Sequence, residues 1–147
     1  MGISDALQLS DAALFGWLTS QQIRTNLLVV SRHLPLDRVA DCLMRRLPSP
    51  AVLSELPGRL RMPVLATGTW FLQDVARMSP AQQYELDRWL VNRQSEIQLV
   101  SISSAPLWPL VATGRFLESL YYGLNSIVFE AESDDLRSNY DERVDAR

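Results

Sequence analysis

The sequence predicts an α/β fold in which helices cover both faces of a mostly parallel sheet. Short, wholly apolar runs such as Asn26–Val30 are typical of strands that are buried on both sides in a parallel sheet. These runs alternate along the chain with segments of helical periodicity such as residues 36–47. At 147 residues and 47% hydrophobic content, the chain can form one well-buried core and is too short for two ordinary domains.

The first elements expected are a helix, a strand and a second helix. Ser10 is expected to cap a helix that carries Leu14 and Trp17, and Asn26–Val30 follows as the first strand. After a loop at Ser31–Pro35, apolar side chains recur at the spacing of one continuous helix face: Leu36, Val39, Ala40, Leu43, Met44 and Leu47. Prolines at positions 48, 50, 57 and 63 then predict the least organised part of the interior.

The second half predicts three further strands and three helices. Ser79, Pro80 and Gln82 form a strong helix start, with a serine cap, a proline at the first helical position and a capping-box glutamine. The remaining elements expected are strands at Thr69–Leu72, Ile97–Ile102 and Ile127–Phe129, a helix that ends near Asn92, and short helices at Trp108–Thr113 and Leu117–Leu124. We expect one domain over residues 1–130 and a polar tail over residues 131–147.

Composition excludes several classes of function. A net charge of -3 and a pI near 5.1 give no general attraction to phosphate backbones or anionic lipid, so neither a nucleic-acid nor a membrane partner is expected. All fourteen basic residues are arginine, which excludes a Schiff-base or phosphate-loop lysine. Cys42 lies on the apolar side of a helix, which predicts a buried reduced thiol and fits the cytoplasm. One histidine and one cysteine do not make a metal site, and no signal peptide or membrane span is expected.

Three stretches follow one another in a recognisable order. Gly68–Val75 reads GTWFLQDV, and Leu99–Ser104 is followed by Leu107, Val111, Gly114 and Phe116. Gly114–Asn125 reads GRFLESLYYGLN. These stretches resemble the AAA+ ATPase domain of bacterial sigma-54-dependent transcription activators, the enhancer-binding proteins, which carry GTLFLDEI at Walker B, VIAATN at sensor I, and GRFREDLYYRLN. The resemblance covers roughly residues 10–130. It implies a three-layer α/β/α P-loop NTPase-like fold, the large AAA+ subdomain, shortened and without the helical lid.

The resemblance also implies a role for individual positions. The family's first Walker B acid helps to hold Mg²⁺ and its second polarises the attacking water; these positions are Gln73 and Asp74 here, and a neutral amide is a poor magnesium ligand. The sensor I asparagine corresponds to Ser104. The two arginines that the family presents to the neighbouring subunit's nucleotide correspond to Leu117 and Gly123. Arginine fingers are worth ~10³ to 10⁵ in rate.

The expected phosphate loop is altered as well. A Walker A loop needs glycines that turn backbone N–H groups toward the phosphates, and a lysine. The chain has neither after its first strand, where Ser31, Arg32 and His33 are vestigial nucleotide-site positions and Pro35 lacks an N–H group. Arginine and histidine in such a loop are usually solvated. The family's GAFTGA insertion, which touches sigma-54, has no counterpart in Pro48–Thr67, so direct activation of sigma-54 polymerase is not expected.

We therefore expect a non-catalytic AAA+-like module, a pseudo-ATPase, that takes no ATP or magnesium and regulates transcription by binding protein. The expected partner is another AAA+ activator or the chain itself as a homo-oligomer. Trp70, Trp108, Tyr121 and Tyr122 are candidate contact residues, although aromatic side chains at such positions mostly fill the core. The alternative is a weak nucleotide-binding protein or ATPase subunit, within a mixed assembly, that uses Asp74, Ser104 and an arginine from elsewhere.

Overall fold

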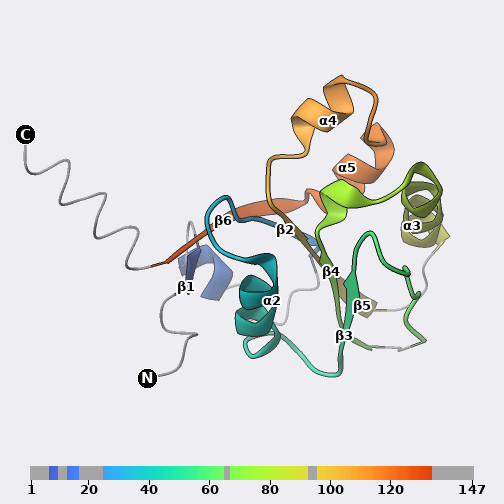
Figure 1. The fold of residues 1–147 in the computed structure, drawn as a ribbon. Helices are drawn as coiled ribbons and strands as arrows, with labels where there is room; N and C mark the ends of the chain where they lie inside the picture. The colour runs from blue at the N-terminus through green and yellow to red at the C-terminus, as the bar shows by residue number, and fades with distance from the viewer. Residues whose placement is uncertain (1–6, 10–12, 17–24, 65–66, 93–95, 134–147) are drawn as a thin grey trace, which may run out of the picture.

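The computed structural model describes residues 7–9, 13–16, 25–64, 67–92 and 96–133. A six-stranded sheet runs in the order β1-β6-β2-β5-β4-β3 (Figure 1). Five of these strands are parallel, and β1 pairs with β6 in the antiparallel direction. The elements are β1 (Leu7–Leu9), β2 (Leu27–Val30), α2 (Leu36–Met44), β3 (Ala51–Glu55), β4 (Thr67–Gln73), α3 (Pro80–Asn92), β5 (Glu96–Ser103), α4 (Trp108–Ala112), α5 (Glu118–Leu124) and β6 (Ile127–Ser133).

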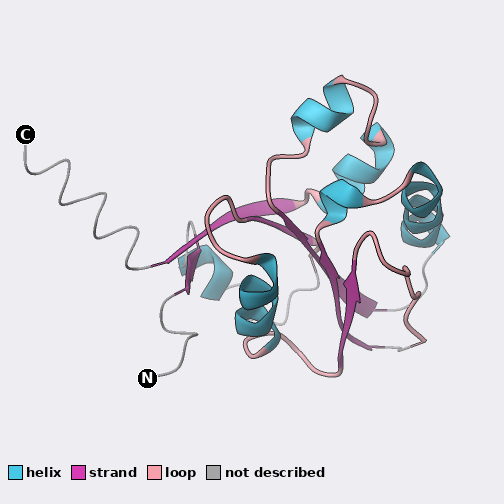
Figure 2. Cartoon of the chain, in the orientation of Figure 1, coloured by secondary structure: helices cyan, strands magenta, loops and turns pink. Residues whose placement is uncertain are grey.

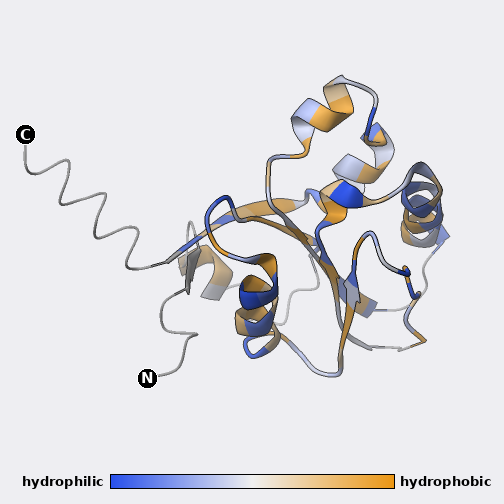
Figure 3. Ribbon diagram, in the orientation of Figure 1, coloured by the Kyte–Doolittle hydropathy of each residue, from blue (hydrophilic) through white to orange (hydrophobic). Residues whose placement is uncertain are grey.

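The sheet is apolar on both faces because successive side chains of its strands point in opposite directions. Leu27 and Val29 of β2 belong to the core cluster beneath α2, whereas Leu28 and Val30 belong to the cluster beneath α3 and α5. Figure 2 shows these helices on either side of the sheet, and Figure 3 shows the apolar character of the central strands. The predicted three-layer α/β/α arrangement with a mostly parallel sheet is confirmed.

Helix α3 begins where the sequence predicted. The backbone N–H of Ser79 donates to Oε1 of Gln82 at 3.1 Å, and the backbone N–H of Gln82 donates to Oγ of Ser79 at 3.2 Å. This reciprocal pair is a capping box, and the helix that it starts is described as far as Asn92. The thiol of Cys42 in α2 is buried and free, which confirms the prediction for this residue.

The prediction for the proline-containing segment was wrong, because strand β3 lies inside it. The four prolines flank Ala51–Glu55 and none interrupts it, so the strand keeps its donors and pairs in parallel with β4. Thr69 ties β4 to the residues just before β3. Its N–H donates to the Pro50 carbonyl at 3.0 Å, and its Oγ1 donates to the Pro48 carbonyl at 2.8 Å.

The ends of the domain are described only in part. Residues 13–16 form a helical turn, and Phe15 packs edge-to-face on Phe129 with ring centroids 5.4 Å apart. The expected cap Ser10 and the expected helical residue Trp17 lie outside the described residues. Strand β6 continues to Ser133, past the predicted domain end at residue 130, and the rest of the predicted tail is likewise not described. None of the described helices combines the length and apolar character needed to cross a bilayer.

Candidate functional site

The residues predicted from the nucleotide site come together at the carboxyl ends of three adjacent strands. In parallel sheets this edge is where ligands bind. The N–H of Ser31, just after β2, donates to the carbonyl of Ser103 at the end of β5, at 2.8 Å. The N–H of Asp74, just after β4, donates to the carbonyl of Ile102 at 2.8 Å. The segments that follow β2 and β4 are therefore both hydrogen-bonded to the end of β5, next to Ser104.

The loop between β2 and α2 closes on itself. Ser31 is buried, and its Oγ donates to the carbonyl of Leu34 at 3.0 Å. Leu34 is itself buried among the residues beneath α2. Pro35 precedes the first turn of α2 and provides no side-chain cap, while its carbonyl accepts the N–H of Val39 at 3.2 Å. The chain thus passes from strand to helix through a compact turn filled by a leucine side chain.

Arg32 and His33 project from this turn and are exposed. Nη2 of Arg32 lies 3.9 Å from Oε1 of Glu130, at the outer limit for an ion pair, and both side chains are more than half exposed. Exposed pairs of this kind contribute little to stability. The prediction that these two side chains are solvated agrees with their positions.

Gln73 and Asp74 carry the least satisfied polar atoms of the site. Oε1 of Gln73 and Oδ1 of Asp74 are buried and accept no hydrogen bond. Asp74 has a φ of 71°, a left-handed conformation that is uncommon outside glycine but tolerated by aspartate. Burial raises the pKa of Asp74, and Arg77, whose Nη1 lies 3.8 Å from Oδ2, partly opposes this rise. The pair presents two acceptors in need of a donor.

The end of β5 presents hydroxyls and no carboxylate. Ser104 is exposed, whereas Ser103 is buried with its Oγ donating to the Ala105 carbonyl at 2.6 Å. Oγ of Ser101 is buried without a partner on the α3 side of the sheet. Within the described ranges, no group of three or more His, Cys, Asp or Glu side chains is placed to hold a metal ion.

The two positions that match the family's arginine fingers lie at α5, where that helix packs on α3. Leu117 directly precedes α5 and is half-buried against the core cluster of that face. Gly123 faces α3 so closely that a Cβ would lie 3.1 Å from Cδ1 of Leu90. Its carbonyl also accepts a hydrogen bond from Nδ2 of Asn26 at 2.9 Å.

Gln83 organises the neighbourhood of Leu117 and was missed at the level of sequence. It is buried, and its Oε1 accepts the N–H of Leu117 at 2.9 Å. Its Nε2 donates to the carbonyls of Met78 and Arg115, both at 3.1 Å. A signal was available, since Gln83 is a polar residue on the face of α3 that buries Leu86.

The candidate contact aromatics divide into core and surface. Trp70 is fully buried, and its Nε1 donates to Oγ of Ser54 at 3.1 Å. Trp108 and Tyr122 are 48% and 61% exposed, and half-buried Tyr121 contacts both rings, with centroids 5.6 and 5.3 Å away. The interpretation as core was right for Trp70, and the interpretation as surface holds for Trp108 and Tyr122.

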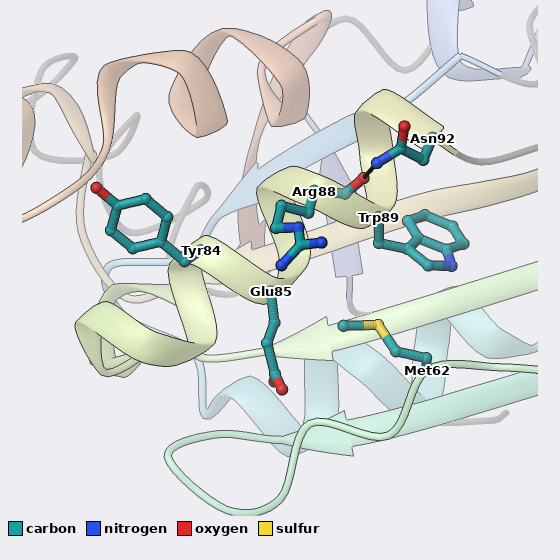
Figure 4. Close-up of a pocket in the computed structure, with 6 residues that line it drawn as sticks. All are labelled: Met62, Tyr84, Glu85, Arg88, Trp89 and Asn92. Carbon is teal, nitrogen blue, oxygen red and sulfur yellow. Dashed lines mark hydrogen bonds between the residues drawn. The ribbon is translucent and has the colours of Figure 1, made fainter.

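A groove on α3 was also missed. It has a volume of about 380 Å³ and lies between α3 and the segment that joins β3 to β4 (Figure 4). Its lining residues are Met62, Tyr84, Glu85, Arg88, Trp89 and Asn92. Sequence pattern does not reveal this groove, because it depends on where Met62 lies relative to α3.

Comparison with known proteins gives a family and a fold. The family model described as the sigma-54 interaction domain matches residues 39–131. NtrX from Brucella abortus, solved in complex with ATP, has a TM-score of 0.61 at 17% identity, over 82% of this chain and 37% of the NtrX chain. The P-loop NTPase domain of the sigma-54 transport activator from E. coli has a TM-score of 0.53 at 17% identity, over 80% of this chain and 92% of that domain. No curated protein matches the chain.

Proposed function

Because the chain belongs to the sigma-54 interaction domain family, we propose that it is a non-catalytic member that regulates transcription in the cytoplasm by binding protein. The proposal includes the absence of ATP and magnesium as cofactors. It rests chiefly on the turn between β2 and α2, the place where a P-loop fold holds phosphate.

A phosphate loop works by aiming free backbone N–H groups at an anion, with glycines allowing the approach and a lysine adding charge. In this turn the N–H of Ser31 is already bonded to Ser103, and Pro35 has no N–H to offer. The hydroxyl of Ser31 bonds the Leu34 carbonyl, and Leu34 turns into the core. These contacts support a loop without the cradle that a triphosphate requires.

The other positions support the same conclusion. Magnesium prefers charged oxygen ligands, and Gln73 supplies a neutral amide. Leu117 and Gly123 carry no charge and pack toward the core and Leu90 instead. Enzymes typically lower the activation free energy of their reaction by roughly 8 to 23 kcal/mol. None of these side chains supplies the charge that would stabilise a phosphoryl-transfer transition state.

One observation favours the alternative, a weak nucleotide-binding subunit. Oε1 of Gln73 and Oδ1 of Asp74 are buried acceptors without donors at the ligand-binding edge of the sheet. A hydrated cation or a donor group of a ligand would satisfy them. Titration with ATP and Mg²⁺ distinguishes this alternative from the non-catalytic function.

Isothermal titration with ATP and Mg²⁺ is the first test. We expect no saturable heat, while an activator domain of the same family with an intact phosphate loop binds under the same conditions. Micromolar binding by this chain would overturn the non-catalytic proposal, and hydrolysis in addition would establish the alternative.

The regulatory part needs a second experiment, in which the chain is mixed with an intact activator domain. We expect the ATPase rate or the assembly size of the activator to change. Trp108→Ala with Tyr122→Ala should weaken that effect, because both rings are exposed, whereas Arg45→Ala, directly after α2, should leave it unchanged. No change in rate or size with the unmodified chain would refute the regulatory role.

A further inference from the structure

Three aromatic side chains form a continuous surface on α4 and α5, two helices that lie next to each other (Figure 1). Trp108 begins α4, and Tyr121 and Tyr122 belong to α5. The half-buried Tyr121 ring contacts both of the others, and Trp108 and Tyr122 are exposed. Tryptophan and tyrosine are among the side chains that most often anchor a partner protein. We call these three rings the aromatic surface.

Carboxylates accompany the aromatic surface. Glu118 precedes Tyr121 and Tyr122 by three and four residues, which places it on their side of α5, one turn away. It is exposed, and it forms no ion pair among the described residues. Helical geometry directs Tyr122 between Glu118 and Ser119. Oγ of Ser119 donates to Oδ2 of Asp87 on α3 at 3.0 Å, so a second carboxylate lies on the other side of α5.

The neighbouring basic residues are placed differently. Arg115 lies in the turn before α5, where its carbonyl accepts Nε2 of Gln83 near the start of α3 at 3.1 Å. Arg88 follows Asp87 in sequence but lines the groove that also contains Met62 (Figure 4). The charge on the part of α5 that carries the tyrosines is therefore negative.

Aromatic rings and carboxylates together favour one class of occupant. The face of an indole or phenol ring attracts a cation, most often a guanidinium. An arginine side chain can stack its planar group on a ring and also donate hydrogen bonds to a carboxylate. An apolar occupant would instead bury the carboxylates without a partner, which costs free energy. An anionic occupant would be repelled by Glu118 and Asp87.

We propose that the aromatic surface binds an arginine side chain on an exposed segment of another protein. The guanidinium lies against the exposed rings and donates to Glu118. Because this chain has a net charge of -3, a basic protein is a more favourable partner than a second copy. This inference deepens the proposed function, since it names the chemistry of the protein partner, and it rests on that proposal only in that the chain acts by binding protein.

Nuclear magnetic resonance titration of the full chain with a short peptide of alternating glycine and arginine tests the inference. The same peptide with lysine keeps the charge but lacks the planar group, and the peptide with citrulline keeps the planar group but lacks the charge. We expect saturable binding of the arginine peptide, with shift changes concentrated at Trp108, Tyr121 and Tyr122. The lysine peptide should bind more weakly, and the citrulline peptide should not bind.

Two variants with matched controls locate the contact. Tyr122→Ala should weaken binding of the arginine peptide about two- to fivefold, the range for a cation on an exposed ring. Tyr84→Ala removes a tyrosine of α3 that is equally exposed, at 61%, and should leave binding unchanged. Glu118→Gln should weaken binding about twofold. Glu85→Gln, an exposed glutamate of α3, changes the net charge equally and should have no effect. Far-UV circular dichroism verifies the fold of each variant.

Four results would overturn the inference. These are equal binding of the arginine and lysine peptides, shift changes away from the aromatic surface, equal effects of Glu118→Gln and Glu85→Gln, and self-association of the chain that Tyr122→Ala abolishes. The two proposals fail separately. A chain that changes an activator's ATPase rate but shows no preference for arginine refutes this inference alone. A chain that prefers arginine and also binds ATP refutes the non-catalytic function alone.

Discussion

Gly68→Ala should be among the most destabilising single substitutions in this protein. Gly68, the second residue of β4, has a φ of 116°, which L side chains rarely adopt, and a Cβ there would lie 2.2 Å from the carbonyl oxygen of Pro50. Cα chirality alone costs about 1 to 2 kcal/mol at positive φ, and forced overpacking adds about 1 to 3 kcal/mol. The expected loss is therefore about 2 to 5 kcal/mol, a large share of the roughly 5 to 15 kcal/mol that stabilises a typical domain.

Gly114 provides the matched control for this substitution. It also has a positive φ, of 75°, but nothing lies within 4 Å of a Cβ built there. Gly114→Ala should therefore cost only the backbone strain, about 1 to 2 kcal/mol. Urea unfolding, followed by tryptophan fluorescence, measures both variants. At an m value near 2 kcal/mol per molar, Gly68→Ala should lower the midpoint by roughly 1 to 2.5 M. Equal midpoints for the two variants would refute the contact with Pro50.

Three other predictions concern the buried side chains of Gln83, Asp74 and Cys42. Gln83→Leu leaves the N–H of Leu117 and the carbonyls of Met78 and Arg115 without their partner. It should lower the free energy of unfolding, measured in urea, by about 2 to 4 kcal/mol. Gln82→Ala at the exposed capping box is the control and should lower it by about 1 kcal/mol. Burial raises the pKa of Asp74 above 3.8, so the ionised carboxylate costs stability at neutral pH and this cost disappears as the pH falls through the folded-state pKa. Asp74→Asn should thus be more stable than the unmodified chain at pH 7, with a smaller advantage near pH 4; an advantage that grows on acidification contradicts this. Cys42 is buried, so a thiol reagent should modify it only as fast as the protein opens, whereas Val91→Cys in a Cys42→Ala background should react at once.

Elements with strong local signals could be predicted from sequence. The start of α3 depends on three neighbouring residues, Ser79, Pro80 and Gln82, and all act as predicted. Strand β2 could be predicted because four successive apolar residues are typical of a strand that is covered on both faces. In both cases the determinants lie within a few residues of one another.

Features that depend on distant parts of the chain could not be predicted. Strand β3 has five residues between prolines, and only its pairing with β4 makes it a strand. The three hydrogen bonds of Gln83 reach up to 34 residues along the sequence. The unsatisfied acceptors of Gln73 and Asp74 likewise arise only in the folded sheet. In the sequence, a glutamine next to an aspartate is indistinguishable from two ordinary surface residues.

The prolines around β3 have a consequence for solution behaviour. As the last strand of the sheet among the described residues, β3 presents one row of backbone groups that no described strand covers, and such rows can recruit strands of other molecules into aggregates. Pro50 immediately precedes the strand and Pro57 follows it by two residues, and neither can donate a hydrogen bond. An incoming strand would therefore find only the five residues between the prolines to pair with, which makes this a short edge strand. The residues that obscured β3 in the sequence therefore also protect the folded protein from forming intermolecular sheets.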